Sequence, residues 1–424
     1  MIQFLLKGIL RDARRSRLPI IIISIGVFLT VVMTTFMSGV IGDMLDMTAK
    51  FQTGHVKVMT RAYADNADLL PNDLAILEVD ELITELEQTY PKMEWAERIR
   101  FGGLVDVPDE QGETREQGPA SAQAVDLFSP NSKEVDRLNI RKSMVTGDIP
   151  SQPGDILLSD DFAKKLGLSI GDKMTFFGST MDGSMTFKNF RMSGTLRFGT
   201  AALDRGSVIL DISDARQMLD MEDAIGELLG YASNGTYDDN RAVEIANEFN
   251  AKRSGSDDEF APIMFAMRDM NDMGAMIDYT KAMTGLMAFI FVFAMSIVLW
   301  NTGLLGGLRR YREFGIRLAM GEEKRHIYKT LIYEALLIGA LGSIIGTILG
   351  LAVAWPLQEF GLDFSSMTQN VGMMLPAVYK AKITATAFFI GFIPGVFSMV
   401  FGNALSGIGI YKRKTAQLFK ELEV

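Results

Sequence analysis

Four long apolar runs divide the chain: Leu18–Ile41, Met283–Leu305, Leu331–Leu357 and Ile383–Ile410. Three of them contain no charged residue, and the third contains only Glu334, near its start. A helix needs roughly 20 apolar residues to cross a bilayer. A helix buried in a soluble core is normally shorter and carries a polar face. The pattern therefore predicts four transmembrane helices.

The first run has an alternative interpretation as a cleaved signal peptide, because a basic segment precedes it. Its basic residues are Lys7, Arg11, Arg14, Arg15 and Arg17. However, the apolar run is longer than the roughly 7–15 residues of a signal-peptide core, and no A-x-A-like cleavage site follows it. We therefore favour an uncleaved membrane anchor.

The distribution of Lys and Arg predicts the orientation of the spans. Segments 1–17, 306–330 and 411–424 carry 16 basic and 6 acidic residues. Basic segments stay in the cytoplasm. Segments 42–282 and 358–382 then lie outside, and 42–282 carries 24 basic against 43 acidic residues. We expect both termini in the cytoplasm.

Segment 42–282 is expected to be a mixed α/β domain with a β-rich insert. Periodic leucines predict a helix over Asn72–Tyr90, and turn residues predict a loop over Glu110–Pro119. Further helices are predicted at Ser159–Leu166, Asp211–Leu219 and Asp238–Lys252. Strands are predicted to start near His55, Gly171, Thr186 and Gly206. The strands cluster between about 120 and 210, with helices flanking them.

Composition excludes several kinds of chemistry. The chain has no Cys and only two His, His55 and His326, which argues against disulfides, thiolate chemistry and a His-rich metal site. A net charge of −10 argues against nucleic-acid binding. No G-x-x-x-x-G-K-[ST] phosphate loop is present, and neither is H-E-x-x-H. We expect no catalytic residue, no metal and no cofactor in this chain, and a structural role for His55.

Methionines recur at heptad spacing where the first two spans reach the outer membrane surface. The first series is Met33, Met37, Val40, Met44, Met47 and Phe51, and the second is Met276, Tyr279, Met283, Leu286, Ile290 and Phe293. Both helices are expected to continue outward as a stalk. The series indicate either helix packing or an adaptable apolar cavity, since Met side chains repack around varied guests.

The third span carries Gly342, Gly346 and Gly350, a spacing that lets helix backbones approach closely. Glu334, in the first turn or so of this span, is expected to pair with a cytoplasmic Arg or Lys. The basic loop before the span also contains apolar residues: Phe314, Ile316, Leu318, Ala319 and Met320. A short amphipathic helix ending near Gly321 would present them to a partner protein.

These segments resemble the FtsX/MacB-type ABC permeases. Arg312–Ile327 (REFGIRLAMGEEKRHI) is similar to the "REIGIRRALGA" segment of that superfamily, and Tyr333–Gly350 fits its "EAL-G-GG-G" pattern. Within the superfamily, Met37–Asp65 and Met144–Gly178 resemble the LolC/LolE lipoprotein-releasing branch.

The resemblance implies an α-helical inner-membrane protein with four transmembrane helices and a large mixed α/β periplasmic domain. Two permease chains, identical or paralogous, would work with a cytoplasmic ATPase dimer that binds ATP and Mg. It implies ATPase coupling through Arg312, Glu313, Phe314, Gly315, Ile316, Arg317, Leu318, Met320 and Gly321.

For the lipoprotein branch, the resemblance implies extraction of lipoproteins by mechanotransmission, with a periplasmic chaperone as a further partner. Acyl chains would sit between the first two spans. The cavity would comprise Met33, Met37, Val40, Met44, Met47, Phe51, Met276, Met283, Leu286, Met287 and Ile290. Efflux of peptides or amphiphilic drugs, and signalling to a periplasmic hydrolase, are the alternatives.

Overall fold

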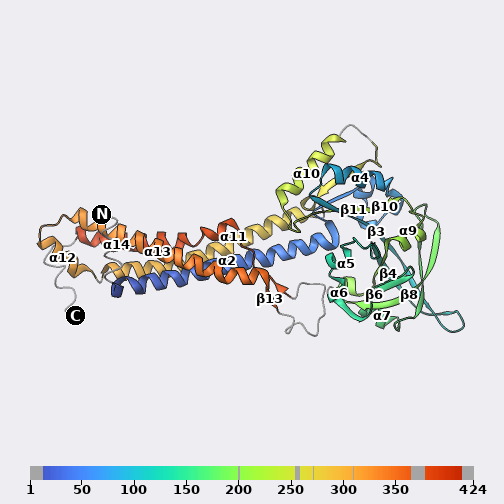
Figure 1. Ribbon diagram of the computed structural model, residues 1–424, viewed down its shortest axis with the longest axis horizontal. Helices are drawn as coiled ribbons and strands as arrows, with labels where there is room; N and C mark the ends of the chain where they lie inside the picture. Colours follow the sequence, from blue (N-terminus) through green and yellow to red (C-terminus); the bar gives the residue numbers. More distant parts are fainter. Residues whose placement is uncertain are drawn as a thin grey trace. The chain divides into compact units, whose positions relative to one another are not determined.

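The computed structural model describes residues 13–198, 201–253, 258–270, 272–308, 310–363 and 378–412. The chain forms two compact units (Figure 1). One is a helix unit drawn from 1–42, 279–362 and 378–424, and the other is a β-rich unit formed mainly by Asp43–Asp278. The predicted fold class, four spans plus a large mixed domain, is confirmed.

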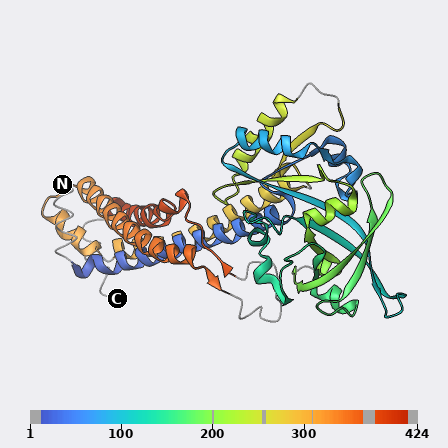
Figure 2. The same ribbon diagram turned by 45° about the vertical axis from the view of Figure 1, so that its right-hand side comes forward.

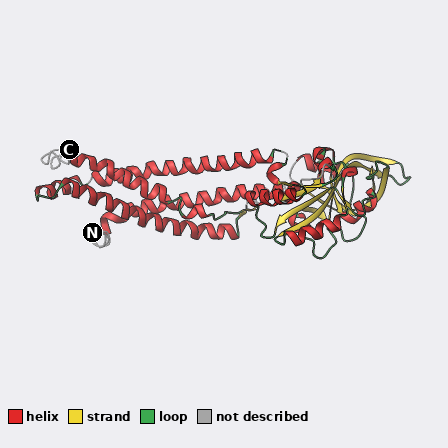
Figure 3. Cartoon of the chain, turned by 90° about the horizontal axis from the view of Figure 1, so that it is seen from above, coloured by secondary structure: helices red, strands yellow, loops and turns green. Residues whose placement is uncertain are grey.

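Four helical segments of the helix unit are long and apolar enough to cross a membrane: Arg17–Thr53, Met273–Leu308, Lys324–Glu359 and Ala385–Ile408. Figure 3 shows the long helices side by side. The helices are α2 (Ala13–Thr48), α11 (Met273–Leu308), α12 (Tyr311–Ala319), α13 (Lys324–Glu359) and α14 (Ser398–Lys412). Helices α2 and α11 extend beyond their apolar runs, as predicted for stalk helices. Helix ends do not mark the bilayer surface, so the exact membrane limits stay predictions.

The last span is not one regular helix. A 3₁₀ turn, Ala385–Phe388, and a π-helical segment, Ile393–Phe397, precede α14. Pro394 lies inside the π-helical segment and cannot donate a backbone hydrogen bond. Irregular backbone of this kind is tolerated at membrane depth where neighbouring helices bury it.

The glycines of α13 contact α2. A Cβ built on Gly346 would lie 2.6 Å from the carbonyl oxygen of Ser24 and 2.7 Å from the Cβ of Val27. Cβ atoms on Gly342 and Gly350 would likewise meet α2 within 2.8 Å. Only glycine permits this separation, and the Ser24 hydroxyl uses it to donate a 3.2 Å hydrogen bond to the carbonyl of Gly342.

The β-rich unit is built on a ten-stranded sheet of order β12-β1-β11-β3-β4-β9-β6-β8-β5, with β7 paired to β3 and β8 (Figure 2). Its strands are β1 (Val56–Thr60), β3 (Met93–Pro108), β4 (Thr114–Val125), β5 (Met144–Gly147), β6 (Asp155–Ser159), β7 (Lys173–Ser179), β8 (Met185–Leu196), β9 (Ser207–Asp211), β11 (Glu227–Ala232) and β12 (Pro262–Ala266). Two short pairs lie apart from it: β2 (Ile76–Leu77) with β10 (Ala224–Ile225), and β13 (Leu362–Asp363) with β14 (Val378–Tyr379).

The two faces of this sheet differ. One face is apolar and packs against α4 (Val79–Thr89), α7 (Asp160–Lys165), α9 (Ile212–Leu219) and α10 (Asp239–Lys252). The other face carries buried charged side chains, Lys57, Arg98 and Glu227 among them. The remaining helices of the unit are short: α3 (Arg61–Asp65), α5 (Glu134–Arg137), α6 (Ile140–Ser143) and α8 (Ala201–Asp204).

Three predicted helices of this domain are confirmed as α7, α9 and α10, and the four predicted strands as β1, β7, β8 and β9. The helix predicted over Asn72–Tyr90 is wrong in its first half, which forms a 3₁₀ turn and β2 before α4 begins. The loop predicted over Glu110–Pro119 is also wrong, because β4 already starts at Thr114. Strands also lie outside 120–210, notably β3 and β11.

Replacement of Gly346 by Ala should destabilise the helix unit, because the new methyl group would meet a backbone carbonyl that cannot rotate away. We expect a cost of roughly 1–3 kcal/mol, measured as a lower melting temperature of the full chain in detergent. Gly285→Ala on α11 is the matched control, since its Cβ would meet nothing within 4 Å. Equal melting temperatures for the two variants would contradict close α2–α13 packing.

Candidate functional site

The predicted docking loop forms helix α12, but its apolar residues are divided between two faces. Phe314 is 1% exposed and packs with Leu318 against Ile327 and Leu331. Its assignment to a free docking surface is therefore wrong: a residue four positions from Leu318 shares its face, and that face is already covered by α13. The outward apolar residues are Ile316, 45% exposed, and Met320, 75% exposed.

The other residues predicted for ATPase coupling lie in and around α12. Glu313 and Arg317 are half-buried, Gly315 is buried, and the side chain of Arg312 lies outside the described residues. Gly321 ends the helix with a φ of 91°, as the sequence predicts. Arg317 donates two hydrogen bonds to Glu322, at 2.6 and 2.5 Å.

An ion pair ties the start of α12 to the third span. Arg310 lies 2.7 Å from the carboxylate of Glu334 and 3.4 Å from that of Glu313. The predicted pairing of Glu334 with a basic residue of the loop before the third span is thus confirmed. The same residues border a pocket of about 470 Å³ whose other walls are mainly apolar, among them Leu18 and Met399, with Thr302 and Asn403. Because Phe314 and Arg310 both attach α12 to α13, a displacement of α12 reaches that span directly.

The methionine series does not form a single packed seam in the described residues. Met276 packs beside Ala49, Met273 and Ile277 at the base of the β-rich unit. Phe51 packs elsewhere, against the cluster around Val125 and Leu138. The physical reason is the π-helical segment Ala49–Thr53, which breaks the heptad register that Phe51 was expected to continue.

The remaining members of the predicted cavity are partly or largely open. Met37, Val40, Met47 and Met283 are half-buried, and the side chain of Met44 lies outside the described residues. Met33, Leu286, Met287 and Ile290 are exposed. In α11, no described residue between Tyr279 and Val298 is buried. This flank of α11 is therefore available to lipid, a substrate or another chain.

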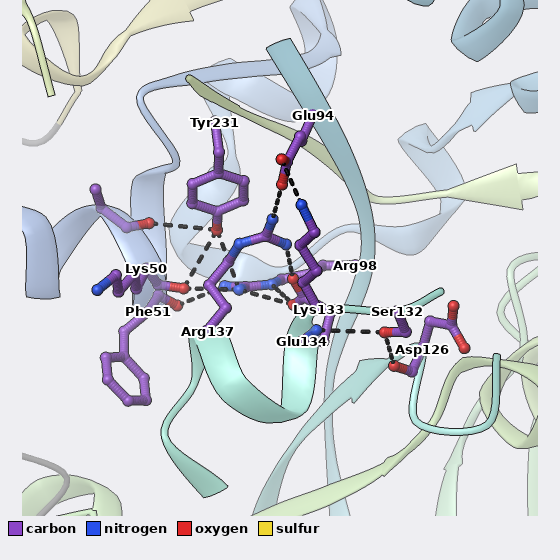
Figure 4. A network of polar contacts seen from close by, with 11 residues as sticks. Lys50, Phe51, Glu94, Arg98, Asp126, Ser132, Lys133, Glu134, Arg137 and Tyr231 are labelled. Carbon is purple, nitrogen blue, oxygen red and sulfur yellow. Dashed lines mark hydrogen bonds and ion pairs between the residues drawn. The ribbon is translucent and has the colours of Figure 1, made fainter. Parts of the chain in front are cut away.

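A buried polar junction, centred on Arg98 of β3, holds the end of the first stalk helix (Figure 4). The Arg98 side chain is 1% exposed. It donates to the carbonyl oxygens of Lys50 and Phe51 at 2.6 and 3.0 Å, and to the carboxylate of Glu134 at 3.0 Å. A guanidinium suits this place because the last carbonyls of a helix lack partners and carry partial negative charge.

Neighbouring residues close the junction on the α5 side. Arg137 bonds both Glu134 and Glu94, and its guanidinium lies 4.0 Å from the ring centre of Tyr231. The Tyr231 hydroxyl accepts from Arg98 at 3.1 Å, and burial raises the pKa of Tyr231 to about 12, so it stays protonated. The junction therefore joins the segment that ends α2 to β3, β11 and α5. Its side chains are buried, so water cannot take their place.

His55 follows the π-helical segment and is structural, as expected. Its Nδ1 accepts a 3.0 Å hydrogen bond from the amide of Ala232, and its ring packs edge-on against Tyr231 and Tyr237. Burial, with the nearby cations Lys50 and Arg137, lowers the pKa of His55 to about 4. It is neutral at physiological pH. Among the described residues, no group of three or more His, Asp or Glu could hold a metal ion.

The sequence did not single out Arg98 or Glu134. The available signal was weak: Arg98 is one of several charged residues alternating with Ile99 and Phe101, and alternation normally indicates a solvated face.

Replacing Arg98 with Met should leave the buried Glu134 and two helix carbonyls short of partners. We expect the β-rich unit to lose about 3–5 kcal/mol of stability, seen as a lower melting temperature of the full chain. Lys133→Met is the control, because this exposed lysine pairs with Glu94 at the rim and should cost less than about 1 kcal/mol. A wild-type melting temperature for Arg98→Met would contradict the assigned role.

Comparison with known proteins agrees with this architecture. A family model described as MacB-like periplasmic core domain matches residues 18–247, and one described as FtsX-like permease C-terminal matches residues 285–415. The periplasmic region of MacB from Actinobacillus actinomycetemcomitans shares 10% identity and covers 55% of this chain and 95% of its own, but with a TM-score of 0.37. That score does not establish a shared fold.

Two kinds of relative are similar in sequence. The lipoprotein-releasing system transmembrane protein LolC of Xylella fastidiosa strain Temecula1 is 22% identical over 250 residues, 57% of this chain and 58% of LolC. The macrolide export ATP-binding/permease protein MacB of Brucella abortus is 35% identical over 123 residues, 29% of this chain and 18% of MacB. The chain thus spans about three fifths of the LolC relatives it matches. Since the periplasmic-core model alone covers more than half of the chain, the chain belongs to the FtsX/MacB-type family of ABC permeases.

Proposed function

We propose that this chain is the membrane subunit of an ABC transporter that extracts lipoproteins from the inner membrane for transfer toward the outer membrane. The observation that carries the proposal is the open flank of α11. Its exposed side chains include Leu286, Met287 and Ile290, at 47–51% exposure. A membrane helix with so little contact inside its own chain can receive an acyl chain laterally from the bilayer. The similarity to LolC supports a lipid-modified substrate.

Affinity for an acyl chain at this flank must come from shape and from polar contacts near the headgroup. Burial of a methylene contributes roughly 0.8 kcal/mol only relative to water. A chain that enters from the bilayer gains almost nothing, since lipid is equally apolar. Weak binding of this kind suits release, because a modest movement of soft, repackable Met side chains is enough to expel the guest.

A separate cytoplasmic ATPase would bind ATP and Mg²⁺ and dock on Ile316 and Met320. Its movement would pass through Phe314 and the Arg310–Glu334 pair into α13. Helix α2 runs unbroken from Ala13 to Thr48 and ends at the Arg98 junction, which supports transmission to the periplasmic domain. We propose both termini in the cytoplasm of the inner membrane and a second permease chain, identical or paralogous, as a further partner. A periplasmic chaperone would receive the substrate.

Efflux of peptides or amphiphilic drugs is the second candidate. The local identity to MacB of Brucella abortus, 35%, is higher than that to LolC, although it covers a shorter part of both chains. Both functions would use an open apolar flank, so only the identity of the substrate distinguishes them.

The docking proposal is tested with Ile316→Asp. A charge in the centre of a protein interface costs several kcal/mol, so the ATPase should no longer co-purify at wild-type stoichiometry. The melting temperature of the chain should change little, because Ile316 is 45% exposed and lies outside the cluster around Phe314. Phe314→Asp should behave differently and lower the melting temperature, since it charges an internal cluster. Retention of the ATPase by Ile316→Asp would rule out this face.

The substrate proposal is tested by photo-crosslinking in cells. A photoreactive residue in place of Met287 should capture a lipoprotein. One in place of Ile348, which is 61% exposed on α13, should capture only lipid. Depletion of the chain should also retain lipoproteins in the inner membrane. Normal lipoprotein fractionation after depletion, together with new sensitivity to amphiphilic drugs, would favour efflux instead.

A further inference from the structure

Two hydroxyl groups inside the helix unit have no hydrogen-bond partner. They belong to Ser343 and Thr347 of α13, which are 0% and 7% exposed. An unpaired hydroxyl in an apolar interior costs free energy because no water is present to replace the missing bond. Their position therefore needs a physical explanation.

Several other hydroxyls among the described residues of the helix unit are satisfied. Thr30, Thr35 and Thr284 each donate to the carbonyl four residues earlier in their own helix, at 2.8–2.9 Å. This is the usual solution for Ser and Thr in membrane helices. Ser24 donates instead to Gly342 across the α2–α13 contact. Ser343 and Thr347 use neither solution and instead face the fourth span.

The fourth span presents bare backbone to them. A Cβ built on Gly395 would lie 2.1 Å from the Ser343 hydroxyl oxygen, and one built on Gly391 would lie 3.3 Å from that of Thr347. Gly339 lies in the same row on α13, and a Cβ built on it would lie 3.0 Å from the carbonyl oxygen of Gly395. Contacts this close leave no room for a bridging water. With water excluded, the possible acceptors are backbone carbonyls, either those of α13 itself or those of the fourth span that the two hydroxyls face.

That backbone is π-helical over Ile393–Phe397 and contains Pro394. A π turn holds one residue more than an α turn, is rare, and occurs mostly as a single turn within α-helices. Removal of the extra residue from the turn would rotate the preceding segment by about 100°, the angle between successive residues of an α-helix. Different carbonyls would then point toward α13.

We propose that the fourth span alternates between the π-helical form and a second form in which Ile393–Phe397 is α-helical and accepts hydrogen bonds from Ser343 and Thr347. The two hydroxyls thereby favour the second form, while the π turn is retained in the first. The bundle contains a conformational switch that is independent of which substrate is carried. The fourth span lies against both helices, since Cβ atoms built on Gly391 and Gly395 would also lie 2.4 and 3.0 Å from Val27 of α2, so the change of form takes place against the fixed α2–α13 pair.

The test compares the full wild-type chain in lipid nanodiscs with the double variant Ser343→Ala, Thr347→Val. The variant removes both unpaired hydroxyls at nearly constant volume, so its melting temperature should rise. The second form loses its hydrogen bonds and becomes rarer. Amide hydrogen exchange of peptides covering 389–398 should therefore slow by at least about tenfold, because the backbone hydrogen bonds of this segment open when the two forms interconvert.

Two further variants serve as controls. Thr347→Ser keeps the hydroxyl and should exchange at the wild-type rate. Thr30→Val removes a satisfied hydroxyl on α2 and should leave exchange at 389–398 unchanged. A lower melting temperature for the double variant would overturn the proposal, since the hydroxyls would then have partners. So would an unchanged exchange rate, or a wild-type segment that does not exchange at all.

Discussion

The guanidinium of Arg98, on strand β3, binds the end of a membrane helix to the β-sheet by hydrogen bonds. Helix α2 ends in a π-helical segment whose last carbonyls have no partner in the helix, and Arg98 supplies donors to two of them. The same group is neutralised by Glu134, which Arg137 also holds. No apolar residue could replace it, because the carbonyls and the carboxylate would be left buried without donors. The periplasmic domain is therefore attached to the first span by hydrogen bonds that break only together.

The helix unit divides into fixed and open parts for a similar reason. Close approach is possible only where a side chain is missing, and α13 supplies two such rows. Gly342, Gly346 and Gly350 meet α2, while Gly339, Ser343 and Thr347 meet the fourth span. Helix α11 has such glycines only towards its C-terminal end, where Gly303 and Gly307 meet α14, while Gly285 and Gly306 have open space where a side chain would be. The part of the second span between Tyr279 and Val298, which has no buried residue, is consequently the part whose surface remains available to other molecules.

The sequence was sufficient for features that depend on one-dimensional patterns. Span number follows from hydropathy, stalk extension follows from the heptad spacing of the methionines, and the helices α7, α9 and α10 were also predicted. The long strand β3 was missed because it contains the charged residues Glu97, Arg98 and Arg100. Arg98 is buried, so the alternation of polar and apolar residues did not match a strand with one solvated face. The position of Phe314 was wrong, because helical spacing groups Phe314 with Leu318 but does not say which face α13 covers. The π-helical segment that diverts Phe51 has no sequence signal.

Stability and movement place different demands on the same four helices, and this chain meets them with different residues. A glycine contact is rigid, since backbone atoms on both sides leave no alternative packing. Exposed Met and Ile on α11 are adaptable, since unbranched or lipid-facing side chains exchange neighbours at little cost. The Arg310–Glu334 pair of the helix unit and the Arg98 junction of the β-rich unit both depend on directional, charge-assisted hydrogen bonds. Directional contacts, a rigid contact at α2–α13 and adaptable surfaces on α11 are therefore supplied by different residues of the same chain.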